Sequence, residues 1–428
     1  MQFHSSKEKK LYYNFPIILF SLIPFFLITG PFLSDLSISI ISLLFISYCL
    51  KNKNFSYFKN RYFYFFLIFW FYLIFNSLIN NFNFDSLKIS FFYFRYGIFV
   101  IAIATLLSFN DEFKKYFFYC IFFCFLVLII DGYYQYFVGE NIFGFKSGSY
   151  FRVSSFFGDE QILGGYLSRL WPIFFGLSIF IFKKKNNLLY LFILIFVLSE
   201  ALIFLTGDRT AFFYINLSAI FVILFSKKLL KLRLFTLLFS LLLIVIINFI
   251  DPTAKERVFD QTFDQMNLSL FNKDSKKNEK IYIFSKSHHE IYISSYKMFL
   301  ENKILGVGVK NYRNLCKNPK YYVDEKEICF THPHNTYIQI LAEIGIIGFV
   351  FLITVVFYFC KYTLLHAILK VKSKNYFNDF EICILSGILI FLWPLVPTGN
   401  FFNNWLNIIM ILNLPFLIWS RKSNRSQK

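Results

Sequence analysis

The feature that most constrains this chain is a succession of apolar segments, each about as long as a helix that crosses a lipid bilayer. A crossing helix needs about 20 mostly apolar residues, because the hydrocarbon core holds no water to satisfy backbone polar groups. Twelve such runs occur, at about residues 14–30, 33–50, 62–80, 89–108, 116–138, 161–182, 188–206, 210–226, 234–250, 337–360, 380–398 and 404–420. This pattern predicts an all-α polytopic membrane protein with about twelve transmembrane helices.

The composition of the chain is also that of a membrane protein. Its 428 residues are 57% hydrophobic and 23% aromatic, which is too apolar for an ordinary soluble protein. The net charge of +19 would suit a nucleic-acid-binding protein if the basic residues formed one patch. They fall instead in short clusters between the apolar runs. We therefore expect membrane lipids, and no nucleic acid, as partners.

The basic clusters also predict an orientation, because short loops rich in lysine and arginine stay in the cytoplasm. Basic residues occur at the N-terminus, in every second connection and in the tail: Lys7, Lys9 and Lys10; Lys51, Lys53, Lys59 and Arg61; Lys114 and Lys115; Lys183 to Lys185; Lys227, Lys228, Lys231 and Arg233; Lys370, Lys372 and Lys374; and Arg421, Lys422, Arg425 and Lys428. Both termini are therefore predicted to be cytoplasmic.

One connection is far longer than the others and divides the chain into three parts. Residues 1–250 hold the first nine predicted helices, residues 251–336 form a large polar loop on the outer side, and residues 337–428 hold the last three helices and the tail. Loops of this size are usually functional or disordered. Short apolar patches within the large loop predict amphipathic helices near the membrane surface. A smaller outer loop, residues 139–160, carries Arg152 and Glu160.

Two of the seven cysteines, Cys316 and Cys329, lie in the large loop. An oxidising compartment on that side of the membrane would permit a disulfide between them. The alternative is two free thiols.

The densest group of polar side chains lies where the large loop enters the tenth predicted helix, in Thr331-His332-Pro333-His334-Asn335-Thr336-Tyr337-Ile338-Gln339. Thr336 and Gln339 have capping-box spacing, so a helix is expected to begin at Thr336. His334 would then lie just before a helix N-terminus, where unpaired N–H groups favour a phosphate or pyrophosphate. A neutral imidazole there could act as a general base. The competing interpretation is a hydrogen-bonded structural histidine.

Metal binding is another use of two histidines separated by one residue. No third ligand of obvious spacing accompanies His332 and His334, although His288 and His289 in the same loop could complete a site. We expect no metal and no other cofactor.

Three arginines in or beside the apolar runs are candidates for polar chemistry. Arg209, after Asp208, lies at the outer boundary between the seventh and eighth predicted helices. It could pair with Asp208 as a snorkelling residue, or it could clamp a lipid-linked phosphate. Charges inside a membrane are costly, so Arg95 and Arg169 are expected to line a polar cavity or to pair with a carboxylate such as Glu160 or Glu200.

Several of these segments resemble one family. His334-Asn335, followed after nine residues by Gly345-Ile346-Ile347-Gly348, is similar to the pattern of the O-antigen ligase and polymerase superfamily of bacterial surface-polysaccharide assembly. Further similarity lies in Gly306-Val307-Gly308 ahead of Asn311-Tyr312-Arg313, in Thr206-Gly207-Asp208-Arg209-Thr210-Ala211, in Asp131-Gly132-Tyr133-Tyr134-Gln135, in Phe156-Phe157-Gly158-Asp159-Glu160, and in the two cysteines that flank the stretch before the histidines.

The resemblance implies an inverting, metal-independent glycosyltransferase of the bacterial inner membrane, with its active site facing the periplasm. Its donor would be an undecaprenyl-pyrophosphate-linked glycan, and its acceptor lipid A-core or another glycan. His334 would be the base that deprotonates the acceptor hydroxyl, and Arg209 would hold the departing pyrophosphate.

The sequence departs from the ligase pattern at a second phosphate-binding arginine, for which Arg257 and Arg313 are the candidates. Further candidates for substrate binding are His332, Asn335, Arg152 and Glu160.

Other functions remain open at this point. A polymerase would use the same donor with another lipid-linked glycan as acceptor, and a protein O-oligosaccharyltransferase would use a protein. A transporter of lipid-linked sugars would place charges at mid-membrane and show internal repeats, whereas the polar residues here gather at one outer loop. We expect the ligase activity, because the histidine-bearing segment is of the ligase type.

Overall fold

The structure is a computed structural model that describes residues 5–80, 83–109, 112–146, 152–182, 186–227, 230–250, 252–268, 280–324 and 327–426. The predicted basic connection at 183–185 and the part of the large loop at 269–279 lie outside the described residues.

The regular elements of this described part are helices. Before the large loop they are α1 (Ser6–Lys9), α2 (Phe15–Thr29), α3 (Pro31–Lys51), α4 (Arg61–Ile79), α5 (Phe84–Phe92), α6 (Phe94–Leu106), α7 (Glu112–Val138), α8 (Leu163–Ile181), α9 (Asn186–Leu205), α10 (Arg209–Phe225) and α11 (Leu230–Ile250). The large loop contains α12 (Pro252–Lys255), α13 (Gln261–Gln265), α14 (Lys286–Glu301) and α15 (Tyr312–Leu315). The chain ends with α16 (Thr336–Val371), α17 (Asp379–Leu392) and α18 (Asn404–Ser426).

The predicted helical class is confirmed, and the protein is a multi-pass membrane protein. Eight helices of the described chain are long and apolar enough to cross a membrane, and Tyr190–Leu205 and Arg209–Phe225 are shorter apolar helices. The predicted run 89–108 begins inside α5 and continues in α6, with a break at Tyr93. The twelve crossings, the cytoplasmic termini and the outer position of the large loop stay predictions.

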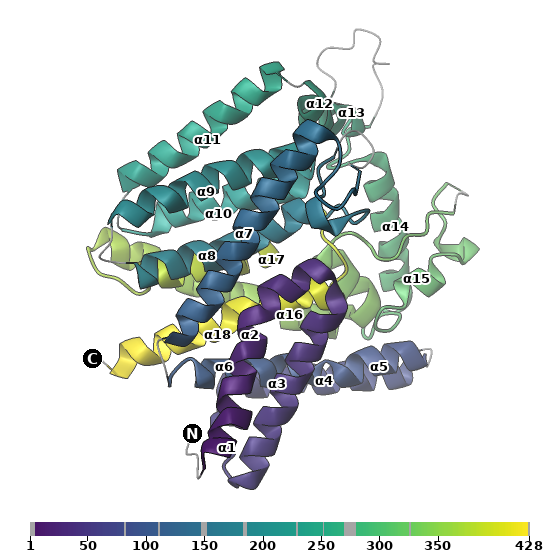
Figure 1. Ribbon diagram of the computed structural model, residues 1–428. Helices are drawn as coiled ribbons and strands as arrows, with labels where there is room; N and C mark the ends of the chain where they lie inside the picture. Colours follow the sequence, from purple (N-terminus) through teal and green to yellow (C-terminus); the bar gives the residue numbers. More distant parts are fainter. Residues whose placement is uncertain are drawn as a thin grey trace.

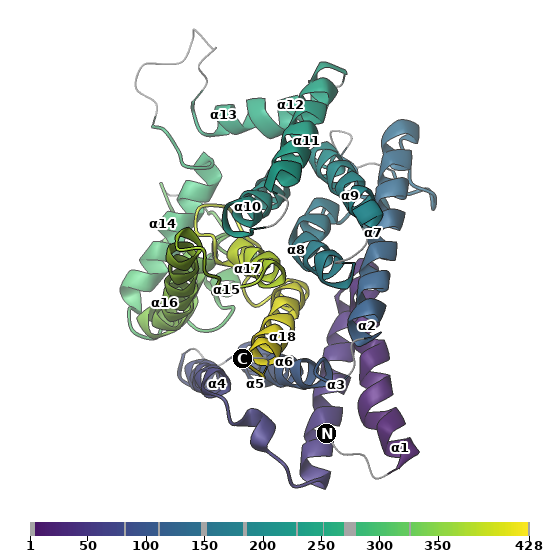
Figure 2. The same cartoon turned by 90° about the vertical axis from the view of Figure 1, so that its left-hand side faces the viewer.

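The helices form a bundle with the elements of the large loop at one end. In Figure 1 both marked chain ends lie toward the left, whereas α14 and α15 lie at the right. Figure 2 shows α14 beside α16, and these two helices pack against each other. At the centre α8 packs against α10 and α17. The main buried core is formed mostly by α2, α3, α6, α7, α8, α9 and α18.

The two glycine motifs of the sequence meet at a break in α16. Gly345 has φ of +64° inside this helix, and Gly306 in the loop after α14 has φ of +72°. The broken turn frees carbonyl groups, and those of Ala342 and Glu343 accept hydrogen bonds from the backbone N–H groups of Val307 (2.9 Å) and Gly308 (2.8 Å). A Cβ atom on Gly306 would lie 2.5 Å from the carbonyl carbon of Glu343, so no larger residue fits. This contact fixes the large loop on α16.

The buried arginines have partners other than the predicted ones. Arg95 forms an ion pair with Asp35, at 2.7 Å. Arg169 donates to the carbonyl oxygen of Gly165 (3.2 Å) and lies over the ring of Tyr214. Arg95 thus lines a polar cavity and pairs with a carboxylate, as predicted, but the two predicted partners, Glu160 and Glu200, are wrong. Asp35 comes from a helix distant in sequence from Arg95, which local spacing cannot reveal, and Glu200 accepts a hydrogen bond from a serine of α11 instead.

Candidate functional site

The start of α16 positions the histidine segment. The helix begins at Thr336, as predicted, and its N-cap is Asn335. Asn335 Oδ1 accepts hydrogen bonds from the backbone N–H groups of Tyr337 (3.0 Å) and Ile338 (3.2 Å). The predicted capping box of Thr336 and Gln339 is therefore wrong by one residue, because Thr336 is already helical and Asn335 has the extended backbone that a cap requires.

His334, the residue before this cap, is held in an unusual backbone conformation. Its φ of +55° is in the left-handed region, which costs a non-glycine residue on the order of 1 kcal/mol. Two hydrogen bonds to the connection between α17 and α18 hold it there: Thr398 N–H donates to the carbonyl oxygen of His334 (2.7 Å), and Asn335 Nδ2 donates to that of Pro394 (2.8 Å). The side chain of Asn335, a predicted substrate-binding residue, thus supports the position of His334.

Three imidazole rings lie together at this point. The ring centroid of His334 is 4.1 Å from that of His332 and 5.8 Å from that of His288. His332 uses both nitrogens: Nε2 lies 3.2 Å from the carbonyl oxygen of Thr398, to which it donates, and Nδ1 lies 2.9 Å from Thr331 Oγ1. Among the described residues no hydrogen bond engages the ring nitrogens of His334, so this imidazole is available to a ligand.

Burial favours the neutral form of all three histidines, because it disfavours the charged imidazolium. It lowers the pKa of His334 below the ordinary 6.5, and together with the charge of His334 it lowers the pKa of His332 to about 4. The pKa of His288 is lowered by burial first, then by the charges of His334 and Arg209. A neutral His334 can accept a proton at pH 7, as a general base must.

Arg209 is the first residue of α10 and reaches across to the segment that contains α12 and α13. Its Nε donates to the carbonyl oxygen of Arg257 (3.0 Å), and its Nη1 donates to Gln265 Oε1 (2.7 Å). Gln261 accepts from Arg257 Nη1 at 3.0 Å. Asp208 does not serve as the predicted ion partner, because its carboxylate caps α10 through the backbone N–H of Ala211. The groups that Arg209 contacts are therefore neutral.

A third arginine, Arg152, joins this group at the turn that contains Gly207. Arg152 Nε donates to the carbonyl oxygen of Thr206 (2.8 Å), and its guanidinium also bonds to Gln161. A Cβ atom on Gly207 would lie 2.9 Å from Arg257 Cγ and 3.6 Å from Arg152 Nε. Burial and then the charge of Arg257 lower the pKa of Arg152. We call Arg152, Arg209 and Arg257 the arginine cluster, and their shared positive field suits a polyanion.

The structure thus brings together five of the predicted residues, which are His332, His334, Arg209, Arg257 and Arg152. The charge of Arg209 acts on His288, which links the arginine cluster to the histidines. Glu160 is exposed and precedes Gln161, the partner of Arg152. Arg313 lies elsewhere: it lines a separate cavity beside α3, α5 and α6, and its Nη2 is 3.5 Å from the carbonyl oxygen of Thr331.

Sequence reasoning named His288 only as a possible metal ligand beside His332 and His334, and it missed the two glutamines that contact Arg209. The spacing Arg257, Gln261, Gln265 is four residues each time, which places all three on one face of a helix. That signal could have favoured Arg257 over Arg313. For His288 a weaker signal exists, since Ser285 caps α14 and places His288 in its first turn.

The described residues contain no group of three or more histidine, cysteine, aspartate or glutamate side chains placed to hold a metal ion. The charged groups here are arginines, which suit an anion and not a cation.

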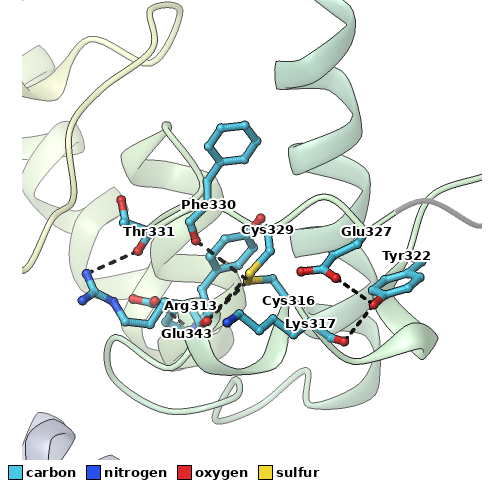
Figure 3. The surroundings of a disulfide bond; sticks show 10 residues. Arg313, Cys316, Lys317, Tyr322, Glu327, Cys329, Phe330, Thr331 and Glu343 are labelled. Carbon is cyan, nitrogen blue, oxygen red and sulfur yellow. Dashed lines mark hydrogen bonds between the residues drawn. A yellow bond between two sulfur atoms is a disulfide. The ribbon is translucent and has the colours of Figure 1, made fainter.

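Cys316 and Cys329 are joined in a disulfide, with their Cα atoms 5.0 Å apart (Figure 3). Cys316 Sγ lies 3.5 Å from the carbonyl oxygen of Arg313 and 3.8 Å from that of Phe330. Phe330 in turn packs on the ring of His334, with 5.8 Å between centroids. The disulfide therefore ties α15 to the segment that leads into the histidines.

Removing this disulfide is expected to loosen the segment before the histidines. A cross-link that closes a loop of this size, with a sequence separation of 13, contributes about 3 kcal/mol in the chain-entropy model. The double variant Cys316→Ser/Cys329→Ser should show faster amide hydrogen exchange across residues 312–334 and unchanged helical content. Cys360→Ser, at an exposed free thiol, is the matched control. Equal exchange in the double variant and the wild type would contradict a constraining role.

Comparison with known proteins relates part of this chain to a known family. Residues 192–353 match the family model described as O-antigen ligase. This segment includes Arg209, Arg257, His288, His332 and His334. No curated protein matches the chain. Residues 192–353 are therefore similar to the O-antigen ligase family, and the resemblance of the sequence to the O-antigen ligase superfamily is confirmed.

Proposed function

We propose that this protein is a glycosyltransferase of the bacterial inner membrane that works on the periplasmic face. It transfers O-antigen or another polysaccharide from an undecaprenyl-pyrophosphate carrier to a hydroxyl group of lipid A-core. The observation that carries the proposal is an available imidazole, His334, together with the arginine cluster. His334, Arg209 and Arg257 lie inside the segment that matches the O-antigen ligase family, and Arg152 lies before it.

His334 supplies the base of the proposed reaction. Its neutral imidazole takes the proton of the acceptor hydroxyl as that oxygen attacks the anomeric carbon of the donor. The bond between the anomeric carbon and the pyrophosphate oxygen breaks on the opposite face, so the configuration at the anomeric carbon inverts. The electron pair of that bond leaves with the pyrophosphate, and the proton on His334 is later released to water.

The arginine cluster supplies the positive charge that the leaving group requires. Negative charge builds on the pyrophosphate oxygens as the bond breaks, and preorganised guanidinium groups stabilise that charge more strongly in a partly buried site than in water. Arg209 and Arg257 are linked through Gln261 and the backbone, so their positions are fixed before the donor arrives. With a good leaving group already on the donor, the proposed reaction uses no cofactor.

The proposal is tested by surface-glycan analysis of a deletion strain complemented with wild type, His334→Ala or Arg209→Ala. Gels and mass spectrometry separate uncapped lipid A-core, capped lipid A and undecaprenyl-linked glycan. We expect long undecaprenyl-linked chains and uncapped core in the deletion strain, corrected by the wild type and by neither variant. His289→Ala is the matched control, because His289 is exposed on α14 next to His288 and should correct the defect fully.

Two other outcomes have defined meanings. Capping of the core with a single repeat in the deletion strain would identify a polymerase, which uses the same donor and a lipid-linked acceptor. Full correction by both His334→Ala and Arg209→Ala would exclude these residues from catalysis.

A further inference from the structure

A polar cavity of about 420 Å³ lies apart from the arginine cluster, among α3, α5, α6, α15 and α18. Figure 2 shows α3, α5, α6 and α18 gathered at the lower part of the view. Ligand pockets generally enclose about 300–1,000 Å³, so the cavity is large enough for a small ligand. Neither the base nor the arginines of the proposed reaction line it.

The floor of the cavity carries buried aromatic rings and amides. Tyr93 and Tyr96 are 6% and 3% exposed, and their hydroxyls lie 3.2 Å from the side-chain oxygens of Asn407 and Asn404, respectively. Asn407 is buried and also donates to the carbonyl oxygen of Phe401, whereas Asn314 and Asn404 line the cavity and are exposed, so their amides can meet sugar hydroxyls. The ring of Phe92, which is 47% exposed, also lines the cavity and can cover the apolar face of a sugar.

The charges of the cavity favour an anion. Arg95 is neutralised by Asp35, at 2.7 Å, which leaves Lys88, Lys310 and Arg313 against the carboxylate of Asp85 among the lining residues. The carboxyl group of Glu343, outside the lining, also acts on Lys310 and Arg313, so the three cations face two carboxyl groups. Burial and then the charge of Arg313 lower the pKa of Lys310, so these cations lie close enough to repel each other. A ligand with a carboxylate or phosphate would relieve that repulsion.

Arg313 connects the cavity to the histidines. Its side chain lines the cavity, and its Nη2 is 3.5 Å from the carbonyl oxygen of Thr331, next to His332 in sequence. The charge of Arg313 also contributes to the lowered pKa of His332. Arg313 thus links the cavity to the segment just before the histidines, whereas Arg209, at the start of α10, acts on His288.

We propose that this cavity binds an anionic saccharide, a sugar with a carboxylate or phosphate group, as the acceptor side of the transfer site. The role of the bound saccharide as an acceptor rests on the proposed function. Binding itself can be measured without transfer. The amides and aromatic rings hold the sugar, Lys88 and Lys310 hold its anionic group, and Arg313 lies between the saccharide and the histidines.

The test uses full-length protein in phosphatidylcholine nanodiscs and saturation-transfer difference NMR, with glucose 6-phosphate as the probe. We expect glucose 6-phosphate to bind the wild type, and to bind Lys88→Gln/Lys310→Gln about tenfold more weakly, because two charge-assisted contacts are lost. Glucose should bind more weakly than glucose 6-phosphate. The variant Lys255→Gln/Lys303→Gln removes two exposed cations that do not line the cavity, so it is the matched control and should bind glucose 6-phosphate as the wild type does. Circular dichroism checks that both double variants fold.

Three results would overturn the proposal. Unchanged binding in Lys88→Gln/Lys310→Gln would show that the cavity is not the binding site. Inorganic phosphate that competes as well as unlabelled glucose 6-phosphate would show an anion site without a saccharide. Loss of the signal in phosphatidylglycerol nanodiscs would assign the cavity to a lipid headgroup. Failure of the proposed function can be distinguished from failure of this proposal, because His334→Gln should lower transfer by about 10²- to 10⁴-fold and leave glucose 6-phosphate binding unchanged.

Discussion

Replacing His334 by glutamine is expected to lower the rate of glycan transfer by about 10²- to 10⁴-fold, the usual contribution of a general base. Glutamine keeps a polar side chain of similar length and cannot accept a proton at neutral pH. The measurement is the rate of transfer from undecaprenyl-pyrophosphate-linked glycan to lipid A-core by purified full-length protein. Donor binding should change little, because the arginine cluster is intact.

Two neighbouring histidines provide controls for this prediction. His289→Gln, on the exposed face of α14, should transfer at the wild-type rate. His332→Gln should lose less than His334→Gln, because both nitrogens of His332 are bound to Thr331 and Thr398 and serve to position the segment. A His334→Gln variant that transfers at the wild-type rate would remove the base from the mechanism.

The pH dependence of the wild type gives a second readout for His334. Only the neutral imidazole can take the acceptor proton, so the rate should fall as pH decreases through the pKa of His334. Burial lowers that pKa below 6.5, so more than half of the activity should remain at pH 6.5. His334→Gln should lack this limb of the profile.

Local sequence patterns predicted the helical class, because each apolar run carries its own length and hydrophobicity, but they did not predict the break at Tyr93 or the end of α17 at Leu392. They also predicted the start of α16 at Thr336. The cap was placed one residue late because both Asn335 and Thr336 are capping types, and only the extended backbone of Asn335 decides between them.

Contacts between distant segments could not be predicted from local patterns. The pairing of Gly306 with the break at Gly345 depends on the path of the large loop across α16. The same is true of the ion pair between Asp35 and Arg95, which are 60 residues apart, and of the contact of Arg209 with Arg257, 48 residues away. A single sequence shows that these residues are unusual, and the tertiary structure shows which of them meet.

Replacing Arg257 by glutamine is expected to lower transfer by about 10²- to 10³-fold, the usual loss when one preorganised donor to developing negative charge is removed. Arg209→Gln should have an effect of similar size. The double variant should lose less than the product of the two single losses, because Arg209 and Arg257 are held together through Gln261 and act on one leaving group. Lys255→Gln, at an exposed cation two residues from Arg257, is the matched control and should transfer normally.

The arginine cluster also predicts an opposite effect on stability, which separates a binding role from a structural one. The charge of Arg257 lowers the pKa of Arg152, so these like charges repel when no anion is bound. Arg257→Gln should therefore raise the unfolding temperature of the ligand-free protein slightly while it lowers transfer, as is common for residues kept for function. Inorganic pyrophosphate should stabilise the wild type more than the variant, since a ligand stabilises only a state that binds it. A variant that is less stable and equally stabilised by pyrophosphate would show that Arg257 supports the fold and does not bind the leaving group.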